Sequence, residues 1–345
     1  MPKKLTVYAP NVHTGGGLVL LVELLANLPP TDSIRLFLDA RLQNNIKLPQ
    51  NASITWSYPR ISSRLMTEFL LWKNNKREDT TVLCFHGLPP LFPLQRQAVV
   101  FVQNRLLIGR ESLTEYPLRI RLRIGIERLL SRKLQSHCSH YIVQTPTMET
   151  LLKKWLRKPI PVSTIAFSPS TFALIPLQSA VVREHFDFLY VASGEAHKNH
   201  LNLLEAWRLL AEAGFMPSLG LTIAPHTHPL LAIEIARYRE AYGLKLVNKG
   251  SVDYNDMRAL YQASSALIYP SRTESFGLPL IEASCLGLPV LAPELDYVRD
   301  VVQPVETFDP NSPVSIARAV KRFLNYPEPA FRIRTTQDFI AEVLK

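Results

Sequence analysis

The sequence predicts an α/β protein built from two Rossmann-like domains with parallel sheets that face one another across a cleft. Strand-like runs alternate with helical runs in both halves of the chain. The alternation is interrupted once, by the proline-punctuated segment Lys158–Pro176. The chain has 345 residues, of which 47% are hydrophobic and 20% charged, a globular balance with room for two cores. We therefore expect one domain over residues 1–168 and a second over residues 169–345.

The N-terminal half begins with a strand, a glycine-rich turn and a helix. Leu5–Ala9 is β-prone, Pro10–Gly17 reads as a loop, and Leu18–Leu28 is a helical run. This apolar run is short and carries Glu23, so it is expected to be a buried helix rather than a membrane span. Further strands are predicted at Ile34–Leu38, Thr81–Phe85, Ala98–Val102 and Tyr141–Gln144, and helices at Leu118–Leu134 and Met148–Leu156.

Strands and helices also alternate in the C-terminal half, which predicts a second parallel sheet. The amino-acid sequence itself shows no internal repeat. Its predicted strands are Phe188–Val191, Leu219–Ala224, Lys245–Val247, Ala266–Tyr269 and Pro289–Ala292. Its predicted helices are Asn199–Ala213, Leu230–Tyr242, Asp256–Ala263, Pro279–Leu286 and Ser312–Asn325. Ligands of open α/β sheets bind beyond the carboxyl ends of the strands, so the site is sought there.

The charge balance favours an anionic partner. The chain has 39 Lys and Arg against 29 Asp and Glu, a formal charge of +10, which suits nucleic acid, an acidic membrane or a phosphorylated substrate. The basic and apolar run Arg119–Lys133 allows three interpretations: a solvated basic helix face, a patch resting on anionic lipid, or a nucleic-acid surface. No nucleic-acid reader motif accompanies it, so we expect no nucleic-acid partner.

The cysteines and the N-terminus bear on location. Cys84, Cys138 and Cys285 lack the spacing of a disulfide framework or a zinc site, and the apolar surroundings of Cys84 and Cys285 predict buried, reduced thiols. The first residues contain no apolar signal-peptide core. We expect a cytoplasmic protein that meets a membrane, if at all, peripherally from one side.

The most informative segment runs from Tyr269 to Pro289, with the letters YPSRTESFGLPLIEASCLGLP. A strand ends, a loop follows, and a helix begins near Pro279, so free backbone N–H groups and the helix dipole can meet an anion. Glu274 lies in the loop and Glu282 about one turn into the helix. Each carboxylate can bind a pair of vicinal hydroxyls; the alternative is one charge at a helix N-terminus and one solvated glutamate.

This run resembles the retaining, metal-independent glycosyltransferases of family 4, which have the GT-B fold. The shared elements are the two glutamates with seven residues between them, the Pro-Ser-x-x-Glu-x-Phe-Gly-Leu-Pro frame, and the following Glu-Ala and Gly-x-Pro-Val. The resemblance implies that Glu274 holds donor-sugar hydroxyls and that Glu282 binds the ribose. It also implies that the backbone of Ser275, Phe276, Gly277 and Leu278 faces the sugar and diphosphate, and that a terminal helix around Thr336–Leu344 packs back on the first domain.

A second strand, glycine turn and helix start lies at Tyr190–Leu201. A lysine at a helix N-terminus opposes the helix dipole, a cost that an anion between them would offset. The segment resembles the family's diphosphate-binding turn, with Gly194 in the turn and Lys198 as the cation. Many family members have an arginine shortly before this lysine, whereas this chain has Glu195. His197 or Arg272 would then complete the charge balance, Arg272 by approaching the same phosphates.

The nucleotide side is expected near Lys249–Val252. By the same resemblance, the backbone at Gly250 and Val252 lies along the base. The family's usual Gly-x-Gly after the preceding strand is replaced by a run that holds His226 and His228, which leaves base recognition open. Two histidines one residue apart without a third ligand are interpreted as a surface loop, so no metal site is predicted.

In the N-terminal half, the candidates depend on position. Gly15, Gly16 and Gly17 precede a helix, and the resemblance implies a loop that covers the donor phosphates when the cleft closes. His86 ends one strand and, by resemblance, would be the active-site histidine near the reacting sugar; a structural role is the alternative. Gln103 and Asn104 end the next strand at the same edge and are candidates for holding the acceptor.

The expected reaction is transfer of a glycosyl group from a nucleoside-diphosphate sugar to an acceptor hydroxyl, with retained configuration and with no metal or cofactor. His86, Lys198 and Glu274 are the predicted catalytic group, and the leaving phosphate, stabilised by Lys198 and backbone amides, accepts the proton. The expected acceptor is a surface or lipid-linked glycan. Two alternatives are a related enzyme that epimerises the nucleotide sugar and a non-catalytic protein of the membrane surface.

Overall fold

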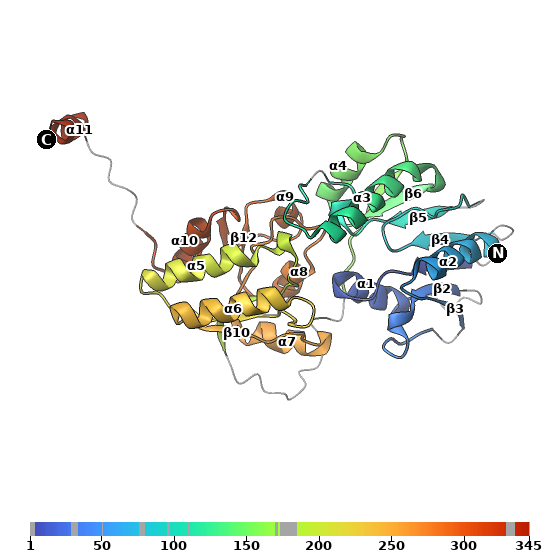
Figure 1. The fold of residues 1–345 in the computed structure, drawn as a ribbon, viewed down its shortest axis with the longest axis horizontal. Coiled ribbons are helices and arrows are strands. Elements are labelled where there is room, and N and C mark those ends of the chain that lie inside the picture. Colours follow the sequence, from blue (N-terminus) through green and yellow to red (C-terminus); the bar gives the residue numbers. More distant parts are fainter. Residues whose placement is uncertain are drawn as a thin grey trace.

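The computed structural model describes residues 4–28, 34–49, 51–75, 80–94, 97–109, 111–169, 172, 185–328 and 335–344. Within these ranges the chain forms two α/β domains that lie beside one another, each built on a fully parallel sheet (Figure 1). The first sheet ends with Thr164 and the second begins with Phe186. The predicted boundary at 168/169 falls in this interval, and part of the predicted connection, including Pro176, lies outside the described residues.

The N-terminal sheet has seven strands in the order β3-β2-β1-β4-β5-β6-β7. The strands are β1 (Lys4–Ala9), β2 (Ile34–Asp39), β3 (Ala52–Ser57), β4 (Thr80–Cys84), β5 (Ala98–Phe101), β6 (His140–Val143) and β7 (Val162–Thr164). The helices are α1 (Gly15–Ala26), α2 (Ile61–Asn74), α3 (Leu118–Lys133) and α4 (Pro146–Trp155), with short 3₁₀ turns η1 (Ala40–Leu42), η2 (Arg105–Leu107) and η3 (Gln135–His137).

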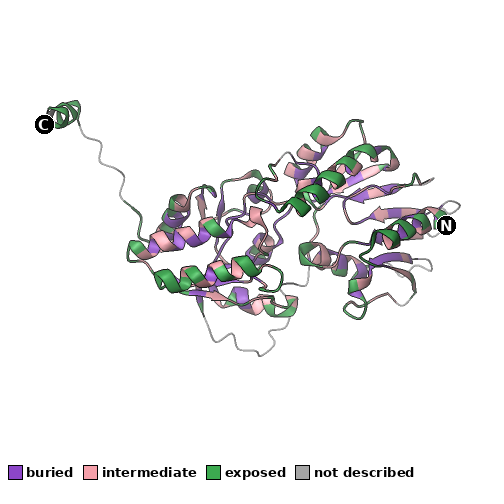
Figure 2. Ribbon diagram, in the orientation of Figure 1, coloured by how far each residue is buried: buried purple, intermediate pink, exposed green. Residues whose placement is uncertain are grey.

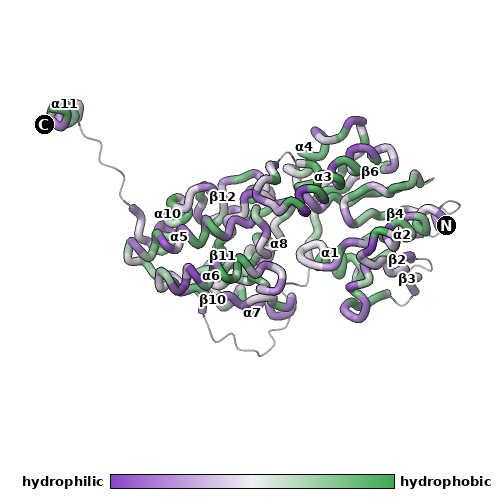
Figure 3. The backbone as a smooth tube through the Cα atoms, viewed as in Figure 1, coloured by the Kyte–Doolittle hydropathy of each residue, from purple (hydrophilic) through white to green (hydrophobic). Residues whose placement is uncertain are grey.

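Side-chain alternation along the strands divides the N-terminal core into two layers. Tyr8 packs in one cluster with Leu71 of α2 and Met148 of α4, whereas the preceding Val7 packs in another with Leu20 of α1. Because successive strand residues point to opposite faces, helices must cover both faces of this sheet. The strands accordingly run through the hydrophobic interior of the domain (Figure 3).

The C-terminal sheet has six strands in the order β10-β9-β8-β11-β12-β13. The strands are β8 (Phe186–Tyr190), β9 (Leu219–Leu221), β10 (Leu246–Asn248), β11 (Ser264–Ile268), β12 (Val290–Pro293) and β13 (Glu306–Phe308). The helices are α5 (His200–Glu212), α6 (Pro229–Tyr242), α7 (Tyr254–Gln262), α8 (Leu278–Cys285), α9 (Asp296–Arg299), α10 (Pro313–Phe323) and α11 (Thr336–Val343), with the 3₁₀ turn η5 (Ala196–Lys198).

Several features differ from the sequence-based expectations. Gly15–Gly17 forms the first turn of α1 rather than a loop before it. The strands β3, β7 and β13 and the helices α2 and α9 were not predicted. Cys285 is exposed, not buried, because it falls in the last turn of α8 where the helix leaves the core; Cys84 and Cys138 are buried.

The terminal helix α11 does not pack against the first domain in this structure. It lies beyond the C-terminal domain, at the opposite end of the molecule from the N-terminal sheet (Figure 1). Its described side chains are exposed, including Phe339 and Val343 (Figure 2). The expectation of a helix that crosses back is therefore corrected.

Candidate active site

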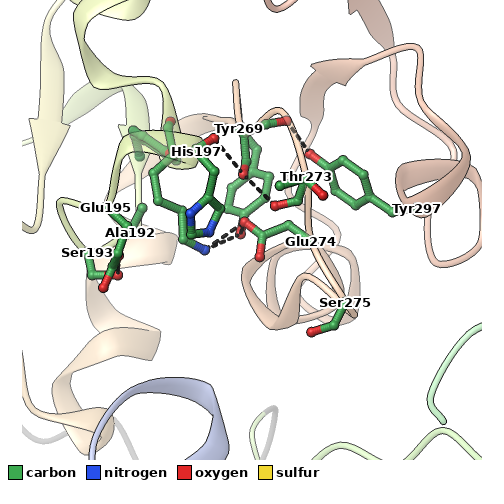
Figure 4. A network of polar contacts seen from close by, with 12 residues as sticks. Ala192, Ser193, Glu195, His197, Tyr269, Thr273, Glu274, Ser275 and Tyr297 are labelled. Atoms are coloured by element: carbon green, nitrogen blue, oxygen red, sulfur yellow. Dashed lines mark hydrogen bonds and ion pairs between the residues drawn. The ribbon is translucent and has the colours of Figure 1, made fainter. Parts of the chain in front are cut away.

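A buried ion pair stands at the carboxyl edge of the C-terminal sheet. Lys198 is the last residue of η5, the 3₁₀ turn that follows β8, and Glu274 lies in the loop between β11 and α8. The Lys198 Nζ atom lies 2.6 Å from Glu274 Oε1, and the two side chains are only 14% and 11% exposed (Figure 4). Two residues that the sequence placed 76 positions apart thus meet, because β8 and β11 are adjacent parallel strands.

The surroundings keep Glu274 ionised. Burial alone would raise the pKa of this carboxyl, but the charges of Lys198 and His197 outweigh burial and hold the pKa below its ordinary value. The Tyr269 hydroxyl donates to the same Oε1 atom over 2.9 Å. An ionised carboxylate in this position can accept hydrogen bonds from vicinal hydroxyls, and the ammonium can hold a phosphate.

Three buried tyrosines support the loop that carries Glu274. The ring of Tyr190 meets that of Tyr269 edge to face, with centroids 5.6 Å apart. The Tyr190 hydroxyl donates to the Lys198 carbonyl over 2.6 Å, and the Tyr297 hydroxyl donates to the Ser271 carbonyl over 2.6 Å. These contacts hold the turn after β8 and the loop after β11 in one arrangement, so the ion pair is preorganised.

Asn199 joins the same two segments and was missed as a site residue by the sequence analysis. Its backbone adopts the left-handed conformation, with φ of 65°. Its buried amide donates to the carbonyls of Pro270 (3.1 Å) and Pro310 (2.6 Å), and its Oδ1 accepts two bonds from Arg272. Asparagine tolerates this conformation better than most residues, which is the one local signal available in the sequence.

Arg272 belongs to the same loop as Glu274, but its side chain contacts the turn after β8 and the first domain. Its Nε and Nη2 atoms donate to Asn199, and its Nη1 atom lies 2.7 Å from both carboxylate oxygens of Glu115 in the N-terminal domain. In this structure Arg272 therefore joins the two domains. Its predicted approach to the donor phosphates is not the arrangement that the structure has.

His197 makes a second contact between the domains. Its Nδ1 atom lies 2.8 Å from the Tyr116 hydroxyl, and the two rings are stacked. Burial, followed by the charge of Lys198, lowers the pKa of His197 below its ordinary value. Glu195 accepts a hydrogen bond from the Ser193 hydroxyl, and although burial would raise its pKa, that bond and Lys198 lower it. The turn thus carries the anionic Glu195 where many members of the resembled family have an arginine.

The loop before α8 packs on the N-terminal domain. Phe276 and Leu278 are buried in the cluster that holds Phe85 and Leu20. The Ser275 hydroxyl donates to the Gln103 carbonyl over 2.6 Å. Gly277 has φ of 77°, a conformation that glycine alone adopts readily. The predicted donor segment is therefore brought against Gln103.

The glycine segment of the first domain reaches the same place. A Cβ atom on Gly16 would lie 3.0 Å from the Leu278 side chain, and one on Gly17 would lie 3.5 Å from the Gln103 amide oxygen. Gly15 has φ of 64°. As the first turn of α1, this segment presents free helical N–H groups toward the loop before α8.

Glu282 is buried in α8. It accepts a hydrogen bond of 2.8 Å from the Tyr261 hydroxyl, and burial raises its pKa to about 7 despite that bond. The nearby Tyr254 hydroxyl is buried and has no hydrogen-bond partner among the described residues. These groups offer acceptors and a donor that a ribose could use.

The predicted nucleotide side is held by a residue that the sequence analysis passed over. The Asn248 amide bridges the ends of β9 and β10, because its Oδ1 accepts from the backbone N–H groups of Ile223 and Gly250. Gly250 has φ of 71°, and Val252 packs against the C-terminal core. A Cβ atom on Gly194 would lie 2.5 Å from the His228 ring, so only glycine fits there.

His226 and His228 do not form part of a metal cluster. Across the described ranges, no group of three or more His, Cys, Asp or Glu side chains is arranged to hold a metal ion. In the same part of the chain, no helix has the length and apolar character needed to cross a bilayer.

The acceptor-side candidates fare differently. His86 packs edge to face on Tyr8, with ring centroids 5.0 Å apart, on the N-terminal sheet. Asn104 caps η2, because its side chain accepts from the Leu106 N–H over 3.0 Å. That structural role explains Asn104 without a ligand.

A hollow of about 610 Å³ opens beside the turn after β8. Gly194, Glu195 and Arg272 line it together with Glu115 from the other domain. Neither Lys198 nor Glu274 lies in its wall. The hollow is thus lined by neighbours of Lys198 in the chain, among them Ala196 and Asn199, rather than by the ion pair itself.

Two facing Rossmann-like domains, with a lysine–glutamate pair and a second buried glutamate on one side of the cleft, define a protein of the GT-B class. A solved structure with this fold is Anabaena HepE in complex with UDP-glucose. The two chains share 16% sequence identity, and the superposition covers 93% of this chain and 89% of that one with a TM-score of 0.67.

Sequence comparison relates the C-terminal part of the chain to known glycosyltransferases. Residues 177–337 match the model of the glycosyl transferases group 1. The chain is 27% identical over 210 residues to the serotype-specific mannosyltransferase WbdA of Escherichia coli, covering 55% of this chain and 26% of WbdA. It is 29% identical over 124 residues to the O-antigen chain mannosyltransferase B of Escherichia coli, covering 33% and 30%. The alignments thus span about a quarter to a third of these relatives. Over residues 177–337 the chain is therefore similar to the group 1 glycosyltransferases.

Proposed function

We propose that this protein transfers a hexosyl group from a nucleoside-diphosphate sugar to a hydroxyl of a glycan acceptor, with retention of configuration, as a family 4 enzyme. The observation that carries the proposal is the buried Lys198–Glu274 pair, with Nζ and Oε1 2.6 Å apart. It places one cation and one hydroxyl acceptor side by side, the two groups that a sugar diphosphate requires. Glu282, which lies about one turn into α8, would complete the donor site by binding the ribose.

In the proposed reaction, the bond between the anomeric carbon and the diphosphate oxygen breaks while the acceptor oxygen bonds to the same face of that carbon. The acceptor proton passes to the leaving phosphate. Lys198 and the N–H groups at the start of α1 and α8 stabilise the charge that develops on the diphosphate. This chemistry needs no metal ion or cofactor. His86 is proposed to face the reacting sugar after donor binding.

The named relatives suggest the donor and pathway. WbdA and the O-antigen chain enzyme are mannosyltransferases, and HepE was solved with UDP-glucose. We therefore expect a hexose donor and an acceptor of the O-antigen or lipopolysaccharide type, assembled in the cytoplasm. Epimerisation of the nucleotide sugar and a non-catalytic role are less well supported, because the named relatives are sugar transferases.

The α3 helix is the candidate for peripheral membrane contact. Leu118, Leu122, Ile126 and Leu129 follow one another at helical spacing and are 53–65% exposed (Figure 2). Arg119, Arg121 and Arg123 flank this apolar stripe. Exposed apolar and basic residues on one helix suit an anionic bilayer surface. Leu122→Gln should reduce co-flotation with phosphatidylglycerol vesicles, whereas Leu230→Gln, an exposed leucine of α6, should not; equal flotation of both contradicts the contact.

The donor proposal is tested by thermal stabilisation with a panel of UDP-, GDP-, ADP- and dTDP-sugars. A donor present at about 100 times its dissociation constant should add about 2.7 kcal/mol to the free energy of unfolding. Lys198→Ala and Glu282→Ala should lose most of this response, and the exposed Lys245→Ala serves as the matched control. If no nucleotide sugar stabilises the parent protein, the donor site is wrong. If a donor binds but is converted to another sugar without acceptor, epimerisation replaces transfer.

A further inference from the structure

A cluster of basic side chains surrounds one carboxylate at the carboxyl edge of the N-terminal sheet, away from the Lys198–Glu274 pair. Asp39 ends β2 and is fully buried. Arg41 donates to it from Nε (2.8 Å), from Nη2 (2.7 Å) and from its backbone N–H (3.0 Å). This bidentate pair holds the Arg41 guanidinium in one orientation.

A second arginine shares the same carboxylate. Arg64, in the first turn of α2, reaches Asp39 Oδ2 with its Nη2 atom over 3.3 Å, and its side chain is 25% exposed. His13 lies 4.0 Å from the same oxygen. One carboxylate therefore faces two guanidinium groups, and the cluster keeps a surplus of positive charge.

The surplus is unfavourable without a further anion. Burial, opposed in part by Asp39 and increased by the charge of Arg41, lowers the pKa of Arg64 below its ordinary value. A guanidinium has five N–H donors, and among the described residues Arg64 uses one of them, in the bond to Asp39. Most of its capacity to hold an anion is thus unused.

His86 supplies an independent observation in the same place. Its Nδ1 atom is buried and has no hydrogen-bond partner in the described parts of the chain. A buried polar atom without a partner is unfavourable, so a bound group that supplies the partner is stabilised. His86 and the cluster share the carboxyl edge of this sheet, because the His86 ring packs on Tyr8 of β1, with centroids 5.0 Å apart, and β1 pairs with β2, which ends at Asp39. Burial, followed by the charge of Arg64, lowers the pKa of His86 to about 4.

The position of the cluster fits an acceptor. His13 precedes the glycine segment whose Gly16 contacts Leu278 of the other domain, so the cluster borders the interdomain contact. The donor groups Lys198, Glu274 and Glu282 all belong to the opposite domain. A phosphate, with up to two negative charges and several acceptor oxygens, matches two guanidinium groups better than a single carboxylate, which Asp39 already provides.

We infer that Arg41, Arg64 and His86 form a phosphate subsite for the acceptor, so that the acceptor of this enzyme carries a phosphate ester or diphosphate. The inference rests on the proposed function, since it names the acceptor of that reaction. Asp39 is a positioning residue, because it orients both guanidinium groups. The apolar side chains of Ile61 and Leu65, exposed on α2 beside Arg64, extend the subsite with a surface for a lipid chain.

The first test is a titration of Lys198→Ala protein with inorganic pyrophosphate, read by the NMR resonance of the His86 ring. The Lys198 substitution weakens the donor site, and the His86→Gln spectrum assigns the resonance among the nine histidines. The His86 resonance should shift with saturation. Arg64→Gln should weaken the apparent affinity at least tenfold, whereas Arg239→Gln, an exposed arginine of α6, should leave it unchanged. A His86 resonance that pyrophosphate does not move overturns the subsite.

The second test separates this inference from the proposed function. Competition of bound pyrophosphate by a prenyl diphosphate in mixed micelles would assign the phosphate to a lipid, and competition by a hexose 1-phosphate alone would assign it to a soluble acceptor. Competition by neither overturns the subsite. With a phosphorylated acceptor, Arg64→Gln should raise the acceptor KM at least tenfold and leave the donor KM unchanged. If nucleotide sugars stabilise the protein but the acceptor KM does not change, the donor site stands and the subsite fails.

Discussion

The two domains carry their functional groups in different ways. In the C-terminal domain, Glu274 and Glu282 belong to one short loop and helix, and Lys198 reaches Glu274 from the turn after the adjacent strand β8. In the N-terminal domain, the basic cluster is assembled from Asp39 at the end of β2, Arg64 on α2 and the loop after β4. A site within one local segment leaves a motif, whereas a site collected from several strand ends leaves none. The proposed donor site could therefore be predicted from the sequence, and the proposed phosphate subsite could not.

The domains also differ in what their asparagines do. Asn199 in the C-terminal domain is buried and joins three segments, through Pro270, Pro310 and Arg272. Asn104 in the N-terminal domain is exposed and caps one 3₁₀ turn. Asn199 and Asn104 both lie beyond the end of a strand, but only Asn199 holds separate segments of the site together.

The largest expected effect tests whether the donor domain carries the chemistry. Lys198→Ala removes the ammonium that would face the diphosphate, and loss of one such group costs about 10²–10³-fold in kcat, or about 2.7–4 kcal/mol. Steady-state kinetics with the donor found by the stabilisation screen measures it. Lys245→Ala is the control. A loss of less than fivefold would move the chemistry away from this domain.

The contrast between the two asparagines predicts a difference in stability. Asn199→Ala leaves the carbonyls of Pro270 and Pro310 with fewer partners and places alanine at a positive φ, so the free energy of unfolding should fall by about 3 kcal/mol. Asn104→Ala should cost about 1 kcal/mol, as for a lost cap. Urea unfolding measures both. Equal losses would show that the tertiary links of Asn199 contribute nothing beyond a local cap.

Glu282 predicts a pH effect confined to the donor domain. Its pKa of about 7 in the folded protein exceeds the ordinary value of 4.5, so the folded state binds the proton more tightly than the unfolded chain. The resulting stability is present below pH 4.5 and is lost as pH rises through 7. Glu282→Gln should therefore be more stable than the parent at pH 8, on the order of 1–3 kcal/mol, and this difference should shrink toward pH 4.5. A pH-independent difference in the unfolding midpoints would exclude this origin.

The smallest expected effect concerns the link between the domains. Glu115 is 54% exposed, so its pair with Arg272 should contribute about 0–1 kcal/mol and weaken in high salt. A double-mutant cycle of Glu115→Gln and Arg272→Gln, followed by thermal unfolding, gives the coupling energy. A coupling above about 2 kcal/mol would mean that the pair locks the domains together.

Most of the helices and strands followed from hydrophobic periodicity and from proline and glycine positions. The exceptions have physical causes. The strands β7 and β13 have three residues each, too few to show a period. The helix α2 was missed because its exposed face is apolar, with Ile61 and Leu65 outward, so its pattern does not alternate between a polar and an apolar side. Cys285 was predicted to be buried because its neighbours in the sequence are apolar, but α8 ends at this residue and leaves it exposed.

The candidate site was predictable to the extent that it is local. The predicted Lys198, Glu274 and Ser275 are brought together by adjacent parallel strands, as the alternation implied. The second partner of Arg272 is Glu115, 157 positions earlier, and no local pattern could have indicated it. Likewise, no local pattern could have indicated the hydrogen bond between Tyr8 and Glu68 in the first domain, because these residues are 60 positions apart.

The sequence by itself determined the two-domain α/β architecture, the family motif and the positions of the two glutamates, because hydrophobic periodicity and residue spacing act over neighbouring residues. Only the tertiary structure decided which charges are paired and which are left over. Arg272 is taken by Asn199 and Glu115, whereas Arg64 shares Asp39 with Arg41 and keeps unused donors. The reason is that burial and electrostatics depend on distances between strand ends, and those distances exist only after the sheets have formed.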